Sequence, residues 1–176
     1  MSTALEVADF IRTRMTPSGE VQLQKLVYYS QAWNMVWNGA PLFLEEIEAW
    51  KGGPVVPSLR KVLDVAPGDY RLDDESRKAI SAVVSYYGVH YGWTLSEQTH
   101  QEVPWVMTRG DLQPGESSRR IIPRTVIRTF YTAMSLRGEG PAKPDTPVAE
   151  APDDTVLALA RRNRLRWADA RALLAE

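Results

Sequence analysis

The chain has 176 residues, and its 21 Lys and Arg side chains nearly balance 22 Asp and Glu, for a net charge of −1. Proteins that bind nucleic acid by neutralising many phosphates usually carry a basic excess, so this balance does not favour a nucleic acid partner. The chain has no cysteine, which excludes disulfide scaffolds, thiolate metal sites and cysteine nucleophiles. Its length and its six Trp and seven Tyr predict one folded domain, or one domain with a small appendage.

The N-terminal part predicts two helices joined by a turn at residues 16–19. Residues 3–14 have an approximate apolar face. Residues 21–37 form the stronger pattern, with apolar side chains around much of the circumference, and a helix of that kind is expected at the centre of a fold. Asn38-Gly39 should end it, because a glycine can adopt the positive φ of a helix C-terminus.

Two observations bear on the cellular location. Glu6 and Asp9 stand where a signal peptide would be basic. Residues 26–44 carry no charge, but their polar side chains, glycine and proline argue against a membrane-spanning helix. We therefore expect a cytoplasmic protein without a membrane partner.

The middle of the chain predicts short elements. Residues 45–51 alternate between polar and apolar side chains, which is typical of a strand in an edge ribbon, and Gly52-Gly53-Pro54 should end it. A second short strand is expected at 120–122. Shorter helices are predicted at 58–63, at 75–87 with Asp73 or Asp74 as cap, at 94–101 from a capping box, from Pro104, and at 123–136.

The composition changes after Arg137. Residues 139–154 contain four prolines and five acids, so the sequence predicts three parts: a domain at 1–137, a linker at 138–154 and a tail at 155–176. The tail has five arginines against two acids and is expected to be helical. The predicted fold class is mainly α: a compact helical domain around a central apolar helix, with a minor two-stranded β ribbon and a C-terminal helical appendage.

Three ordered motifs carry a family resemblance. They are LQKLVYYSQAW at 23–33 with GAPLF at 39–43, IEAWK at 47–51 with GPVVP at 53–57, and Leu95-Ser96 with Thr99-His100, Glu102 and Pro104-Trp105. Together they resemble the Panacea domain of the SocA-like antitoxins over about residues 3–136. Gly52 departs from the pattern, since the family usually has a larger residue there.

The resemblance implies a small, mostly helical domain that acts as the antitoxin of a toxin–antitoxin pair, with phage defence as an expected setting. Members of the family bind their toxins directly, and a relative acts as an adaptor that hands its toxin to a protease. The implied partner is a cognate toxin protein, with a protease or a second copy of the chain as further candidates. No enzymatic activity, cofactor or metal is expected.

Several residues are candidates for binding the toxin. Trp50 and Trp105 border proline-containing breaks, where amphipathic rings often anchor partners. The aromatic residues on the predicted helices are expected in the core. The full set of candidates is Trp50, Lys51, Pro54, Val55, His100, Trp105, Arg161, Arg164 and Trp167.

Three features have alternative interpretations. His100 has no accompanying nucleophile or phosphate-binding loop, so a structural hydrogen bond at a helix end is favoured over catalysis. Gln31 either bonds to the loop at 52–57 or lines a groove that meets the toxin. The tail is either an amphipathic helix that docks on a partner or on the domain, or the front half of a helix-turn-helix. Direct binding of a toxin is the predicted function, and the alternatives are a proteolytic adaptor or an autoregulator that binds DNA through the tail.

Overall fold

Helix α2 (Glu20–Trp37) is the central element of the fold, as its apolar circumference predicts. We describe a computed structural model for residues 2–113 and 115–144. Fifteen of the eighteen residues of α2 are buried, including Trp33, Tyr28 and Tyr29. The protein is mainly α, so the predicted fold class is confirmed. The tail at 155–176, with Arg161, Arg164 and Trp167, lies outside the described residues.

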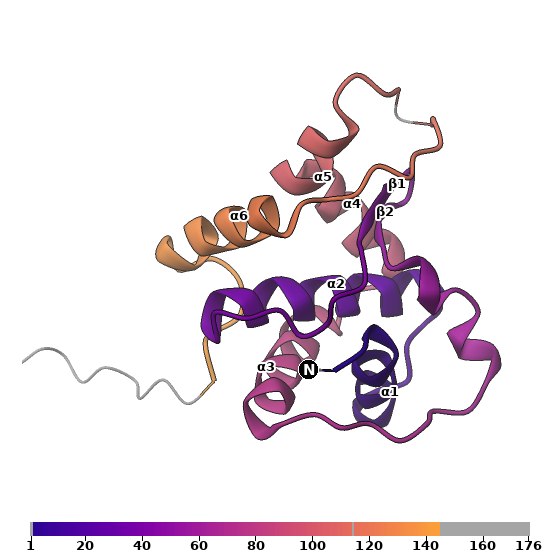
Figure 1. Ribbon diagram of the computed structural model, residues 1–176, viewed down its shortest axis with the longest axis vertical. Coiled ribbons are helices and arrows are strands. Elements are labelled where there is room, and N and C mark those ends of the chain that lie inside the picture. The colour runs from indigo at the N-terminus through magenta and orange to yellow at the C-terminus, as the bar shows by residue number, and fades with distance from the viewer. Residues whose placement is uncertain (1, 114, 145–176) are drawn as a thin grey trace, which may run out of the picture. The chain divides into compact units, whose positions relative to one another are not determined.

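Five further α-helices are described around α2. Helices α1, α3, α4 and α6 pack directly against α2, and α5 packs against α4 and α6. In Figure 1, α1 and α3 lie on one side of α2, while α5 and α6 lie on the other. Their bounds are α1 (Ala4–Arg14), α3 (Asp74–Tyr87), α4 (Gly92–Gln101), α5 (Val103–Arg109) and α6 (Arg124–Leu136).

The start of α4 differs from the prediction. The capping box expected at Thr94 does not form, and the helix begins at Gly92, after an extended Tyr91. Gly92 lies against α2, where a Cβ atom would come within 2.7 Å of the Gln22 main-chain nitrogen. Close packing of two helices therefore determines where α4 begins. The predicted cap of α3 is confirmed, since the Asp73 side chain accepts a hydrogen bond from the Ser76 N–H.

The predicted helix at 58–63 is wrong. The structure has two 3-10 turns instead, η1 (Pro57–Leu59) and η2 (Val62–Asp64). Lys61 between them adopts a left-handed conformation with φ of 63°, which an α-helix cannot contain. Each turn contributes one buried apolar side chain, Leu59 from η1 and Val62 from η2.

The β ribbon is a hairpin of β1 (Glu48–Trp50) and β2 (Gly53–Val55). The strand predicted at 45–51 does end before Gly52, but its partner strand was not expected to begin directly at Gly53 and to include Pro54. Residues 120–122 do not form a separate strand, although Ile121 makes one bridge to Glu48. The hairpin packs against α2 and α4 through β2 and against α5 through β1.

A proline in β2 is compatible with the hairpin because of its register. Pro54 lies opposite Ala49. The Ala49 N–H donates to the Arg120 carbonyl at 2.8 Å, and its carbonyl accepts from the Arg109 guanidinium at 3.2 Å. Both main-chain groups of Ala49 thus bond away from Pro54. The missing N–H of the proline therefore costs no bond between the strands.

The segment after α6 packs on the central helix. Pro141 is buried, and Gly140 lies so close to the Trp33 ring that a Cβ atom would come within 2.2 Å of it. Residues 138–144 therefore cover part of the core. Among the described residues, no helix has the length and apolar character needed to span a membrane.

Candidate functional site

The β1–β2 hairpin is held by side chains from three helices. The Lys25 ammonium of α2 donates to the Pro54 carbonyl at 3.0 Å, and the Ser96 hydroxyl of α4 donates to the Gly52 carbonyl at 2.6 Å. The Trp105 indole N–H of α5 donates to the Trp50 carbonyl at 2.8 Å. These bonds fix the main chain of the hairpin, so the side chains at its turn are presented by a rigid support.

Gly53 allows the hairpin to approach this close. Its φ is +101°, and a Cβ atom there would lie 2.6 Å from both the Lys25 Nζ and the Thr99 Oγ1. At the neighbouring Gly52, a Cβ atom would meet no other atom within 4 Å. The position where the sequence departs from the family pattern therefore has room for the larger residue.

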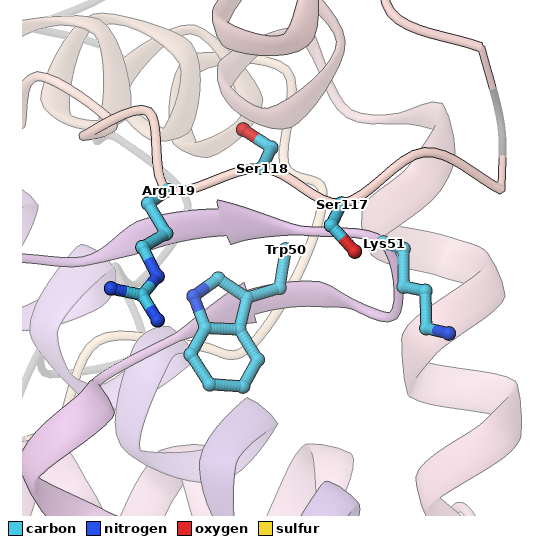
Figure 2. A pocket seen from close by; sticks show the side chains of 5 residues that line it. All are labelled: Trp50, Lys51, Ser117, Ser118 and Arg119. Atoms are coloured by element: carbon cyan, nitrogen blue, oxygen red, sulfur yellow. The ribbon is translucent and has the colours of Figure 1, made fainter.

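Trp50 lies between two hollows on the surface. The first has a volume of about 280 Å³ and is lined by Trp50, Lys51, Ser117, Ser118 and Arg119. Figure 2 shows the Trp50 ring and the Arg119 side chain extending to the same side of the hairpin. The Trp50 indole N–H donates to the Glu48 carboxylate at 2.6 Å. The Arg60 guanidinium lies over the ring, 5.6 Å from its centroid.

The second hollow, of about 310 Å³, lies between the hairpin and α2. It shares Trp50 and Lys51 with the first hollow, but its lining also includes an acidic residue and apolar side chains. The other lining residues are Glu20, Val21, Gln24, Lys25, Gly52 and Val55. Lys51 and Trp50 are therefore the two side chains common to both hollows.

His100 packs behind the hairpin against Trp105. The two rings are stacked, with centroids 4.2 Å apart. Burial lowers the pKa of His100, and the nearby charges of Lys25 and Arg109 act in the same direction. Its Nε2 atom is buried and has no hydrogen-bond partner within the described part of the chain. The structure therefore gives His100 a packing role and shows no nucleophile bonded to it.

A buried polar cluster lies beneath the hairpin. The Glu102 carboxyl accepts hydrogen bonds from the Tyr131 hydroxyl at 2.6 Å and from the Tyr29 hydroxyl at 3.2 Å. Burial raises the pKa of Glu102 to about 7, although these hydrogen bonds and the charge of Lys25 oppose the shift. Burial lowers the pKa of Lys25 to about 7, opposed by the charge of Glu102. The cluster joins α2, α6 and the end of α4 in the core.

Gln31 is structural, but its partner differs from the expected one. Its side-chain amide donates to the Phe43 carbonyl at 2.9 Å and accepts from the Leu42 N–H at 2.7 Å. The loop at 52–57 is bonded instead by Gln24, which pairs with both main-chain groups of Val56. The sequence identified the amide-rich helix but not which amide meets which loop.

The predicted site residues within the described range converge on the hairpin, but their exposure differs. Lys51 is exposed, and Trp50, Val55 and His100 are partly exposed. Pro54 and Trp105 are buried, so they support the hairpin from inside. Arg161, Arg164 and Trp167 lie outside the described residues. Sequence reasoning missed Arg60, Ser117, Ser118 and Arg119, because their loops meet Trp50 only in the folded chain.

Two aromatic residues of the segment predicted as a turn lie on the surface. Tyr91 and Trp93 are 65% and 64% exposed at the start of α4, whereas Tyr29 and Tyr87 stack in the core with centroids 3.9 Å apart.

A third hollow, an apolar groove of about 410 Å³, follows α5 and α6, with Met107 and Phe130 in its lining. In the described residues, no group of three or more His, Asp or Glu side chains is placed to hold a metal ion.

The fold is a mainly α domain whose hairpin is held by bonds from side chains to the main chain. Residues 23–106 match the family model described as antitoxin SocA-like, Panacea domain. The resemblance predicted from the motifs is therefore confirmed over α2 to α5, a region that includes the hairpin and is just under half of the chain. The family description suggests a toxin–antitoxin role that is regulatory, with a toxin as partner. No curated protein and no solved structure matches the chain.

Proposed function

We propose that this protein is an antitoxin that neutralises a cognate protein toxin by binding it directly, through the surface around the β1–β2 hairpin. One observation carries the proposal: motifs from separate parts of the matched region meet at this hairpin. Lys25, Ser96 and Trp105 each bond a different main-chain carbonyl of the hairpin. The region shared with the family is thus the one that positions Trp50 and Lys51.

The arrangement is suited to binding. A surface that is already ordered loses little conformational entropy when a partner docks, which favours tight association. Trp side chains are frequent among the residues that contribute most to protein interfaces. The polar groups behind the hairpin are occupied in holding it, and they present no aligned nucleophile and base. Occlusion or distortion of the toxin requires only a stoichiometric complex.

Co-expression with the protein that the neighbouring gene encodes tests the proposal. We expect the two proteins to co-purify as a stable complex and toxicity to be suppressed. Trp50→Ala should weaken the complex by about thirtyfold or more, because truncation of a central interface residue costs about 2 kcal/mol or more. Trp93→Ala is the matched control, since Trp93 is exposed at the start of α4 and not at the hairpin.

The proposal fails if toxicity is suppressed while no complex forms at micromolar concentrations. The amount of toxin in the same cells separates the adaptor mechanism from simple occlusion. Under direct neutralisation, the toxin level stays constant and the complex persists. A toxin that disappears only when the antitoxin and an intact protease are both present indicates delivery to that protease.

A further inference from the structure

The first hollow beside Trp50 has more positive than negative charge in its lining. Its lining consists of one aromatic ring, two hydroxyls and two cations, with no acidic residue. Arg60 adds a third cation over the Trp50 ring. Lys51, Arg60 and Arg119 are all exposed. Lys51 comes from the hairpin turn and Arg119 from the loop before α6, and they line opposite ends of the hollow (Figure 2). The folded chain therefore gathers positive charge at this place although its net charge is −1.

These three cations also lack acidic partners. Within the described residues, Lys51, Arg60 and Arg119 form no ion pair. Neighbouring arginines do: Arg120 pairs with Asp111 at 3.1 Å, and Arg124 pairs with Glu46 at 3.6 Å. An anionic group that docks here would therefore find cations that are not already paired with a carboxylate.

Three acids near the hollow in sequence or in space have other partners or positions. Glu116, next to Ser117, accepts from the Gln113 N–H at 3.3 Å. Glu48 accepts the Trp50 indole N–H at 2.6 Å, which directs its carboxylate to the ring nitrogen. Glu20 lines the second hollow, between the hairpin and α2, and not the first. The two hollows on either side of Trp50 thus differ in charge, and only the first is lined by cations without any acid.

From this geometry we infer that the first hollow receives an acidic segment of the toxin, whose carboxylates bind Lys51 and Arg119 and whose neighbouring apolar side chain packs against Trp50. The inference rests on the proposed function and identifies the chemistry of the partner. Two hydroxyls, of Ser117 and Ser118, can donate further hydrogen bonds to the carboxylates. A volume of about 280 Å³ accommodates a few side chains.

A nucleic acid is a poorer fit to the same charges. Binding of a single strand uses several aromatic side chains on which successive bases stack, and this hollow is lined by one ring, that of Trp50. Binding of a duplex also requires a longer track of cations to neutralise successive phosphates. Here two cations line one hollow, and a third lies over the ring of Trp50.

Charge reversal tests the inference. The experiment uses the full chain in complex with the toxin that the neighbouring gene encodes. The variants are Lys51→Glu, Arg119→Glu and the double variant, with Arg14→Glu as the matched control because Arg14 is exposed at the end of α1. We expect the double variant to weaken binding by about tenfold or more in titration calorimetry, while Arg14→Glu leaves the affinity unchanged. The wild-type affinity should fall as salt rises from about 50 to about 300 mM. Reversal of one acidic residue of the toxin to Lys should restore binding to the double variant.

The outcomes separate this inference from the proposed function. A wild-type complex whose affinity responds to neither the reversals nor salt overturns the acidic-segment inference and leaves direct neutralisation intact. Absence of any complex overturns both. Another contrary outcome is tight binding of the wild type to a DNA duplex from the promoter of its own gene. If the double variant loses this binding but keeps toxin binding, the hollow binds nucleic acid, and the inference is overturned. Thermal unfolding of each variant verifies that the fold is retained.

Discussion

The indole N–H of Trp105 donates a hydrogen bond to the main-chain carbonyl of Trp50 at 2.8 Å, between residues 55 positions apart. One tryptophan is buried in α5 and the other is at the surface of the hairpin. The buried ring therefore helps to hold the exposed one in place. The same division, between a supporting residue and a presented one, applies to Lys25 beneath the hairpin and Lys51 at its turn.

Gly53→Ala should destabilise the protein by about 1–3 kcal/mol or more, because an L side chain is strained at a φ of +101°. The new methyl would also collide with Lys25 and Thr99, both 2.6 Å away. Urea unfolding measures the loss, and the affinity for the toxin should fall with it. Gly52→Ala is the control, with a change within about 0.5 kcal/mol. Equal effects of the two substitutions would show that close packing of Gly53 is not required.

Trp33→Ala should cost about 3–5 kcal/mol of folding free energy, since Trp33 is fully buried and its removal leaves a large cavity. The ring donates to the Tyr87 hydroxyl at 3.2 Å and is covered by Gly140. Domains usually have only about 5–15 kcal/mol of stability, so this variant should be poorly folded. Trp93→Ala removes an exposed ring and should leave the melting temperature nearly unchanged. An unchanged melting temperature for Trp33→Ala would contradict the central place of this residue.

Local patterns predicted the helices well. The apolar circumference of residues 21–37 identified the central helix, and the cap of α3 was predicted as Asp73 or Asp74, of which Asp73 is the one observed. Each of these features depends on neighbours within a few residues along the chain. Hydrophobic periodicity and capping residues are therefore sufficient to predict these helices.

Features that depend on distant contacts were not predictable in the same way. Pro54 indicates a break by itself, and it fits a strand only because Ala49 opposite it bonds to Arg109 and Arg120. The start of α4 at Gly92 depends on contact with Gln22 of α2. The site was predicted in part: Trp50 and Lys51 belong to a motif, whereas no local pattern connects Arg119 with them.

The buried pair Lys25 and Glu102 should give stability a minimum near pH 7. Burial raises the pKa of Glu102 from 4.5 to about 7, so between these values the folded protein keeps a proton that the unfolded chain releases, and stability falls as pH rises. Burial lowers the pKa of Lys25 from 10.5 to about 7. Between these values the unfolded chain holds a proton that the folded protein has released, so stability rises with pH.

Urea midpoints at about pH 5, 7 and 9.5 measure this profile. Glu102→Gln should flatten the fall on the acid side, and Lys25→Met should flatten the rise on the basic side. Glu97→Gln, at an exposed position of α4, should keep both slopes. A wild-type stability that rises steadily from pH 5 to 9.5 would contradict the buried environment of Glu102.

Two truncations test the function of the segment beyond the described fold. A chain that ends at Pro144 retains Gly140 and the buried Pro141 over Trp33, so it should keep the melting temperature of the full chain. A chain that ends at Arg137 uncovers part of the Trp33 ring and should melt at a lower temperature, since buried apolar surface becomes exposed. We propose that residues 155–176 contact the toxin, and on that basis the chain ending at Pro144 should fold normally yet bind the toxin less tightly. Full neutralisation by that chain would rule out a contact by the tail and leave the hairpin surface as the binding site.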